Sequence, residues 1–282
     1  PVDMRSGFVS FVGRPNVGKS TLLNAICKKK VSIVSDKPQT TRTRVRGVVT
    51  TEDTQVVFVD TPGLHKAVSA LGERVNATAL ESTKDVDVVC LVIDATAPFG
   101  AGDKWVSSHI DMSKAIVVLN KVDKAGPTKV LKQLTALSQL NAAEYFPVSA
   151  ATGEGVEVLM RYLQSKMPEG EMLYPADMVS ETPESTWIAE LVREQLLVYT
   201  NQELPYSIAT RVTEWEPPRV RVEIVVERES QKGMVIGKGG AMLNVVGTNV
   251  RKQLPKGMFL ELAVVVDKNW QQRAERVERL GY

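Results

Sequence analysis

The sequence predicts an α/β domain with a mostly parallel sheet and helices on both faces, followed by a smaller α+β domain. Short apolar runs recur through the first half of the chain, and each precedes a polar or glycine-containing motif. The second half instead begins with an amphipathic helical pattern and two successive strand patterns. With 282 residues, the chain has the length expected for about two domains.

Four apolar runs in the first half have the residue types and length of buried strands. Each precedes a motif, and open α/β sheets bind ligands at the carboxyl ends of their strands. We therefore expect the motifs to gather at one edge of the sheet. The runs are residues 8–12, 56–59, 115–119 and 145–148, and the motifs are residues 13–20, 60–63, 120–123 and 149–150.

The first motif, Gly-Arg-Pro-Asn-Val-Gly-Lys-Ser at residues 13–20, matches the phosphate-binding pattern G-x-x-x-x-G-K-S. Gly13 and Gly18 let successive backbone N–H groups turn toward the phosphates of a nucleotide. Lys19 is expected to neutralise the β- and γ-phosphates. This motif predicts a nucleotide-binding domain.

The residues that follow supply the expected metal and γ-phosphate contacts. Ser20 offers a hydroxyl ligand to Mg²⁺, and Thr21 extends the nucleotide-binding set. A helix over residues 20–27 places its positive dipole end beneath the phosphates. Asp60 is expected to reach Mg²⁺ through a water, and the Gly63 N–H to contact the γ-phosphate. Together with the lysine of the first motif, Asp60 and Gly63 are the candidate catalytic residues.

Between these motifs lies the sequence Gln-Thr-Thr-Arg at residues 39–42. A threonine here can complete the Mg²⁺ shell only while the γ-phosphate is present, which would make the segment a switch. The sequence does not choose between Thr40 and Thr41, so both are candidate metal and nucleotide contacts.

Asn120, Lys121 and Asp123 in the third motif determine which base is bound. The Asp123 carboxylate can accept two hydrogen bonds from guanine, from N1–H and the 2-amino group, whereas adenine lacks both donors. Facing adenine, the carboxylate would be an unpaired desolvated acceptor, which costs about 1–3 kcal/mol. GTP and GDP are therefore the predicted ligands, and an adenine-nucleotide enzyme is not expected. We expect Asn120 to tie this loop to the phosphate loop and Lys121 to cover the nucleotide. The backbone of Ser149 and Ala150 completes the base pocket.

Leu64 follows the glycine of the second motif, where Ras-like enzymes carry a glutamine that orients the attacking water. A leucine side chain can neither orient nor deprotonate water. We therefore predict a GTPase with a slow intrinsic rate.

Domain boundaries follow from the end of the nucleotide motifs. A helical pattern over residues 156–166 closes the predicted GTPase domain, which spans residues 1–167. Residues 168–183 are interrupted by Pro and Gly and are predicted to form a linker. The second domain spans residues 184–282.

The second domain is predicted to have the order helix, strand, strand, helix, helix, strand, with a G-x-x-G sequence between the central helices. This is the arrangement of a type II KH domain, whose extra helix and strand precede the core. The expected elements are helix 185–199, strands 206–215 and 220–227, helix 241–253, strand 258–266 and a charged helix 270–280.

The G-x-x-G segment is the candidate RNA-binding loop. Glycine lets the backbone approach a sugar-phosphate chain closely, and a lysine inside the segment adds positive charge. The candidate RNA-binding residues are Lys232, Ile236, Gly237, Lys238, Gly239 and Gly240.

Overall composition is less informative than these motifs. The net charge is +2, and residues 184–282 contain 14 Lys and Arg against 13 Asp and Glu, so charge alone does not predict a nucleic-acid partner. No apolar run approaches the roughly 18 residues of a membrane span, and no secretory signal is visible. Cys27 and Cys90 are predicted to be small buried hydrophobes in a reducing compartment. Pro1 stands where an initiator Met is expected, which indicates a trimmed or engineered amino terminus.

On these motifs the chain resembles the Era-type GTPases, bacterial and organellar ribosome-assembly factors with one GTPase domain followed by one KH domain. The resemblance covers essentially all 282 residues and extends to Leu64, because this group has a hydrophobic residue there. It implies Mg²⁺ as cofactor, binding to the 3′ end of 16S ribosomal RNA and action on the immature 30S ribosomal subunit. It also implies a cytoplasmic location with peripheral association with the inner membrane. Asn16, in the form P-N-x-G-K-S, implies that a K⁺ ion can be held near the phosphates.

Two functional classes remain open from the sequence. The first is an RNA-directed assembly switch, in which GTP controls access to the KH groove. The alternative is a signalling or cell-cycle GTPase whose KH fold docks a protein or a membrane surface. The G-x-x-G segment favours the first.

Overall fold

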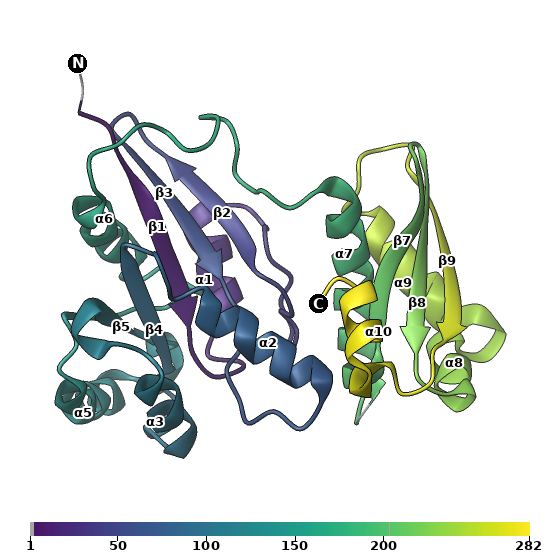
Figure 1. Ribbon diagram of the computed structural model, residues 1–282, viewed down its shortest axis with the longest axis horizontal. Coiled ribbons are helices and arrows are strands. Elements are labelled where there is room, and N and C mark those ends of the chain that lie inside the picture. The colour runs from purple at the N-terminus through teal and green to yellow at the C-terminus, as the bar shows by residue number, and fades with distance from the viewer. Residues whose placement is uncertain (1–2, 203) are drawn as a thin grey trace. The chain divides into compact units, whose positions relative to one another are not determined.

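The computed structural model describes residues 3–202 and 204–282, and the chain divides into two compact units (Figure 1). Two segments that lie within the predicted GTPase domain cluster with the second unit. The first unit comprises Pro1–Val34, Thr41–Lys66 and Val75–Glu181, and the second comprises Ser35–Thr40, Ala67–Arg74 and Thr182–Tyr282.

Within the described residues, the sheet of the first unit has six strands in the order β2-β3-β1-β4-β5-β6. The outermost strand, β2, runs antiparallel to β3, and all other neighbours are parallel. The strands are β1 Arg5–Val12, β2 Val45–Thr50, β3 Thr54–Asp60, β4 Val88–Asp94, β5 Ala115–Asn120 and β6 Glu144–Pro147.

Helices cover both faces of this sheet because its strands are apolar on both sides (Figure 1). In β5, Ile116 and Val118 join a core with α1 and α6, whereas Val117 and Leu119 join a core with α2, α3 and α5. This confirms the predicted fold class. The helices are α1 Lys19–Cys27, α2 Ala70–Glu81, α3 Ala101–Ser108, α4 Val122–Ala125, α5 Pro127–Leu137 and α6 Val156–Lys166, with short 3₁₀ turns η1 Met112–Lys114 and η2 Ser138–Leu140.

All four motifs lie at the carboxyl ends of parallel strands, as predicted. β1 ends at Val12, β3 at Asp60, β5 at Asn120 and β6 at Pro147. These strands run in the same direction, so their carboxyl ends share one edge of the sheet. That edge carries the candidate nucleotide site.

The edge strand β2 was not among the strands expected from the sequence. It forms a hairpin with β3, in which the Thr51 N–H donates to the Thr54 carbonyl at 2.8 Å. Its sequence, Val-Arg-Gly-Val-Val-Thr, contains glycine and arginine and lacks the continuous apolar character of the central strands.

The predicted linker, residues 168–183, lies along the first unit as far as Glu181. Buried Gln55 fastens it: its Oε1 accepts from the N–H groups of Leu173 and Tyr174 at 2.7 and 3.0 Å, and its Nε2 donates to the Tyr174 carbonyl at 2.9 Å. The segment is thus held by hydrogen bonds despite its Pro and Gly residues.

In the part of the second unit that the structure describes, three strands form a sheet in the order β7-β8-β9. β7 and β8 are antiparallel, whereas β8 and β9 are parallel, and helices α7, α8 and α9 pack on the sheet through one apolar core. The observed order confirms the predicted KH fold. The elements are α7 Glu184–Tyr199, η3 Leu204–Ser207, β7 Ala209–Glu216, β8 Arg219–Val226, α8 Glu229–Ile236, η4 Lys238–Gly240, α9 Ala241–Arg251, β9 Phe259–Val266, η5 Trp270–Gln272 and α10 Ala274–Arg279.

The carboxyl-terminal segment differs from the single charged helix expected over residues 270–280. A 3₁₀ turn holding the buried Trp270 is separated from α10 by Arg273, whose backbone is extended. The Trp270 indole N–H donates to the Ser207 carbonyl at 2.8 Å, and the Arg273 guanidinium pairs with Asp267 at 2.7 Å. These two tertiary contacts fix the break in the helix.

Candidate functional site

The phosphate loop depends on glycine at two positions. Gly18 has a φ of 100°, and a Cβ there would lie 2.1 Å from Nδ2 of Asn120. A Cβ on Gly13 would lie 2.6 Å from the Val92 carbonyl oxygen. Asn16 also has a positive φ, 65°, which asparagine tolerates better than most residues. Close packing therefore explains the glycines at positions 13 and 18, and positive φ angles explain Gly18 and Asn16.

Lys19 lies buried beneath this loop. Its ammonium donates to the backbone carbonyls of Arg14 at 2.9 Å and Gly13 at 3.3 Å. Burial lowers the pKa of Lys19 to about 8, although the nearby Asp60 carboxylate acts in the opposite direction. A buried ammonium held by carbonyls alone is placed to neutralise phosphate oxygens.

A cluster of oxygen atoms forms where α1, the switch segment and β3 meet. Ser20 Oγ donates to Asp60 Oδ2 at 2.6 Å and lies 2.9 Å from Thr41 Oγ1. Ser32 Oγ donates to the same carboxylate oxygen at 3.2 Å. Ser32 could not be identified from the sequence, because an isolated serine outside every motif gives no signal.

This cluster fits the oxygen chemistry of Mg²⁺. The other carboxylate oxygen of Asp60, Oδ1, is buried with no hydrogen-bond partner in the structure. An orphaned buried oxygen is costly unless a further ligand satisfies it, and Mg²⁺ with its waters binds carboxylate and hydroxyl oxygens. Burial also raises the pKa of Asp60, and a cation at this position would favour its ionised form.

The two switch threonines have different partners. Thr40 Oγ1 donates to the Lys37 carbonyl at 2.6 Å and lies 2.5 Å from Ser35 Oγ. Thr41 Oγ1 instead faces Ser20 in the oxygen cluster. The structure thus separates two residues that the sequence left equivalent.

Arg193 holds the backbone of this switch segment within the second unit. Its guanidinium is fully buried, pairs with Glu190 at 2.6 Å, and donates to the carbonyls of Gln39 and Thr40. Arg193 could not be identified from the sequence, because it lies in an amphipathic helical pattern, where an arginine is ordinarily solvated.

The second motif packs tightly on the phosphate loop. A Cβ on Gly63 would lie 2.6 Å from the backbone nitrogen of Pro15, and the Leu64 N–H donates to the Gly13 carbonyl at 2.9 Å. The Leu64 side chain is 1 % exposed and belongs to the core that contains Val12. Leu64 therefore points into the sheet–helix core and has a packing role.

Asn120 joins three loops of the base-binding edge, as its motif predicted. Its Nδ2 donates to the Val17 carbonyl at 2.9 Å, and its Oδ1 accepts from the Ala150 N–H at 3.0 Å. Ser149 Oγ donates to Asp123 Oδ1 at 2.9 Å, which fixes the carboxylate while the residue stays exposed. The carboxylate is therefore oriented before a base arrives.

Lys121 crosses toward the phosphate loop. Its ammonium donates to the Asn16 carbonyl at 2.7 Å and pairs with Asp94 at 2.9 Å. Asp94 ends β4, so the carboxyl end of a fifth strand contributes to the site. The lysine stem is thereby held in an extended path beside the nucleotide-binding edge.

The G-x-x-G loop of the second unit lies between α8 and α9. Gly237, Gly239 and Gly240 have φ values of 75°, 63° and 79°. A Cβ on Gly237 would lie 2.8 Å from the Met242 backbone nitrogen, so this glycine is required by the turn itself. Nothing lies within 4 Å of a Cβ on the other two, and Lys238 is exposed. The open side of the loop is therefore at residues 238–240.

The remaining predicted RNA-binding residues lie on α8. Lys232 is half-buried, and Ile236 packs against the apolar core of the second unit while remaining partly exposed. None of the described helices is both long enough and apolar enough to cross a membrane.

Family models match both units of the chain. Residues 8–121 match a family described as a 50S ribosome-binding GTPase, and residues 203–271 match the KH domain family. Fold and site thus define a P-loop GTPase joined to a KH domain. The GTPase Era of Mycobacterium sp. (strain JLS) is 43% identical over 297 residues, covering 99% of each chain, and that of Mycobacterium tuberculosis (strain ATCC 25177 / H37Ra) is 43% identical over 298 residues. The chain belongs to the Era family of GTPases.

Solved structures of Era proteins have the same fold. Era in complex with MgGDPNP and nucleotides 1506–1542 of 16S ribosomal RNA aligns with a TM-score of 0.95 at 37% identity, covering 99% of each chain. An Aquifex aeolicus Era variant bound to GDP and AlF4⁻ aligns with a TM-score of 0.94 at 36% identity and the same coverage.

Replacing Asp123 with asparagine should change the base that is bound. An amide would face the donors of guanine with a donor of its own, so Asp123→Asn should weaken GTP binding about tenfold to a hundredfold and improve binding of xanthosine triphosphate. Fluorescent-nucleotide competition measures both affinities. Asp177→Asn, at an exposed site in the linker, is the matched control. Unchanged GTP affinity in Asp123→Asn would sink the assignment.

Proposed function

We propose that this GTPase is a switch that binds the 3′ end of 16S ribosomal RNA and assists assembly of the 30S ribosomal subunit. The observation that most strongly supports this function is that one chain carries both the guanine-nucleotide motifs, at one edge of the sheet, and an open G-x-x-G loop. The Era relative crystallised with MgGDPNP and 16S ribosomal RNA nucleotides supports the same RNA as partner.

Hydrolysis in this scheme relies on electrostatics more than on a catalytic base. Lys19 neutralises charge on the β- and γ-phosphates, and the Gly63 N–H contacts the γ-phosphate from beside Pro15. Mg²⁺ held by the Ser20 hydroxyl and, through water, by Asp60 would supply further charge neutralisation when bound. Leu64 is buried in the core and cannot position water, so the unstimulated rate is slow.

Thr41, and not Thr40, is the switch ligand in our proposal. The Thr41 hydroxyl lies beside Ser20 Oγ, whereas the Thr40 hydroxyl is engaged by Ser35 and the Lys37 carbonyl. Loss of the γ-phosphate would release Thr41 and with it the segment that precedes it.

Matched valine substitutions test this choice. Thr41→Val keeps the β-branched shape but removes the hydroxyl, so it should raise the Mg²⁺ concentration for half-maximal hydrolysis about tenfold. Thr40→Val should leave that concentration unchanged, although it removes two local hydrogen bonds. Mg²⁺ titrations of GTPase rate, with folding checked by circular dichroism, give the comparison. If the two variants shift equally, or only Thr40→Val shifts, the assignment is wrong.

A potassium site beside the phosphates is a further part of the proposal. It rests on Asn16 in the P-N-x-G-K-S motif, whose positive φ places it at the exposed turn of the phosphate loop. Hydrolysis should be faster in KCl than in NaCl at equal ionic strength, and Asn16→Asp, which retains an oxygen at this turn, should alter that ratio more than it alters nucleotide affinity. Equal rates in the two salts would argue against the site.

RNA binding is assigned to the exposed part of the G-x-x-G loop. Glycines at positions 239 and 240 leave the backbone open, and Lys238 supplies the positive charge for a phosphate. Counterion release on neutralising phosphates makes such binding weaker as salt rises.

Charge reversal in this loop should separate RNA binding from hydrolysis. Lys238→Asp places like charge against phosphate and should weaken binding to the 3′-terminal segment of 16S ribosomal RNA about tenfold, with a smaller salt dependence. The unstimulated GTPase rate should stay near the parent's, because no nucleotide contact changes. Lys268→Asp, an exposed lysine after β9, is the charge-matched control.

The alternative function gives a different result in the same experiment. A signalling or cell-cycle GTPase whose KH fold docks a protein or membrane surface would show RNA affinity that does not depend on Lys238. Flotation with vesicles of inner-membrane lipid composition measures the peripheral membrane association that the family resemblance implies. RNA binding unaffected by Lys238→Asp, together with vesicle flotation, would favour the alternative.

A further inference from the structure

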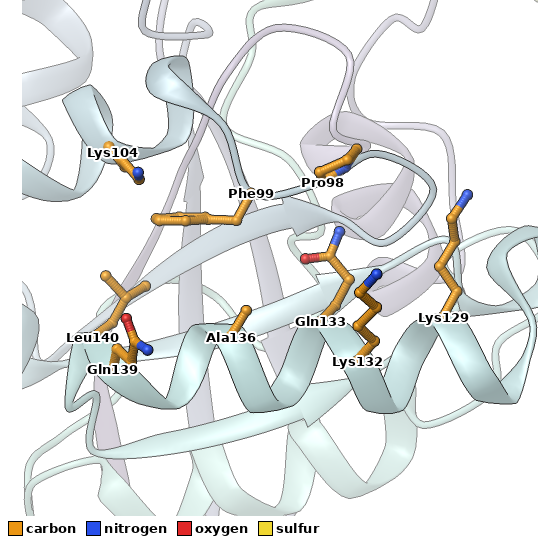
Figure 2. Close-up of a pocket in the computed structure, with 9 residues that line it drawn as sticks. All are labelled: Pro98, Phe99, Lys104, Lys129, Lys132, Gln133, Ala136, Gln139 and Leu140. Carbon is orange, nitrogen blue, oxygen red and sulfur yellow. The ribbon is translucent and has the colours of Figure 1, made fainter.

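A cleft in the first unit lies outside the nucleotide-binding motifs in the sequence. It has a volume of roughly 580 Å³ and is bounded by the loop at Pro98 and Phe99, by α3 and by α5 with η2 (Figure 2). That volume is within the range of small-molecule sites, about 300–1,000 Å³. No residue of the four motifs lines it.

The floor of this cleft is apolar and continuous with the protein core. Phe99 and Leu140 pack against the buried cluster beneath α3 and α5. Figure 2 shows the Phe99 ring above the α5 side of the cleft, with Ala136 and Leu140 below it. The floor therefore offers an aromatic ring and aliphatic carbons to a ligand.

Two side chains of α5 hold the loop that carries Phe99. Gln133, which is buried, donates from Nε2 to the Ala97 carbonyl. The Lys129 ammonium donates to the Thr96 carbonyl at 3.0 Å. These hydrogen bonds thus join α5 to the loop that carries Phe99, so two sides of the cleft are fixed relative to each other.

The charges that line the cleft all have one sign. Lys104 on α3 and Lys129 and Lys132 on α5 contribute three ammonium groups, and the lining residues include no carboxylate. Within the described part of the chain, Lys104 and Lys132 take part in no ion pair. In Figure 2, Lys104 lies on one side of Phe99 and the two α5 lysines on the other. The cleft therefore combines positive charge with an apolar floor.

We propose that this cleft binds a small organic anion: a molecule with a planar apolar body and a phosphate or carboxylate group. The body would lie against Phe99, Ala136 and Leu140, and the anion would be held by the lysines of α3 and α5. All three lysines line a single cavity. A nucleic-acid strand would instead need a positively charged groove that tracks its backbone.

The test uses 1-naphthyl phosphate as probe on the full chain, with the nucleotide site saturated by GDP and Mg²⁺. Ligand-detected NMR should show it binding at least about tenfold more tightly than either inorganic phosphate or 1-naphthol, because the cleft recognises both parts. Binding should persist when GDP is raised further, since the two sites are separate.

Three variants locate the site. Lys104→Glu with Lys132→Glu should weaken probe binding about tenfold, whereas the charge-matched pair Lys84→Glu with Lys114→Glu should not. Ala136→Trp fills the exposed α5 face of the cleft without changing charge and should also block the probe. Circular dichroism and GDP affinity confirm that each variant is folded.

Several results would overturn the proposal. Equal weakening by the control pair, or phosphate binding as tightly as the naphthyl ester, would mean that scattered lysines attract anions without a site. An unchanged affinity in Ala136→Trp would place the probe elsewhere. If a short acidic tryptophan peptide binds in the cleft and the naphthyl ester does not, the surface docks protein and not a metabolite.

Discussion

The nucleotide site depends on burying two opposite charges without pairing them directly: Lys19 at the start of α1 and Asp60 at the end of β3. The Lys19 ammonium is held by backbone carbonyls, and one Asp60 oxygen has no partner at all. Burial disfavours the charged form of both groups, lowering one pKa and raising the other. Phosphate oxygens would accept hydrogen bonds from the Lys19 ammonium, and a bound Mg²⁺ with its waters would satisfy the Asp60 carboxylate.

Parallel strand pairing is what makes this possible. β1 and β3 are neighbours in register, with Phe11 opposite Asp60, so the phosphate loop and the Asp60 carboxylate lie side by side. Asn120 then ties the phosphate loop to the base-binding loops with one amide. A nucleotide is therefore recognised by a rigid edge whose parts come from distant segments of the chain.

The switch segment is held differently from this edge. Thr41 belongs to the first unit and faces the oxygen cluster, whereas Thr40 clusters with the second unit, where Arg193 donates to its carbonyl. Two consecutive residues of the switch segment therefore have different surroundings.

Sequence alone determined the strand-end motifs, the preference for guanine, the fold classes and the KH order, because local patterns encode strand burial, phosphate loops and glycine turns. It did not determine β2, because that strand lacks the continuous apolar character of the central strands. It also did not determine the break at Arg273 or the roles of Ser32 and Arg193, since the Trp270, Ser32 and Arg193 side chains have partners far away in the chain. The sequence shows that Leu64 occupies the position of the glutamine of Ras-like enzymes. Only the tertiary structure shows that its side chain packs in the core. The choice between Thr40 and Thr41 was likewise left to tertiary structure: the residues are chemically identical and differ only in what surrounds them.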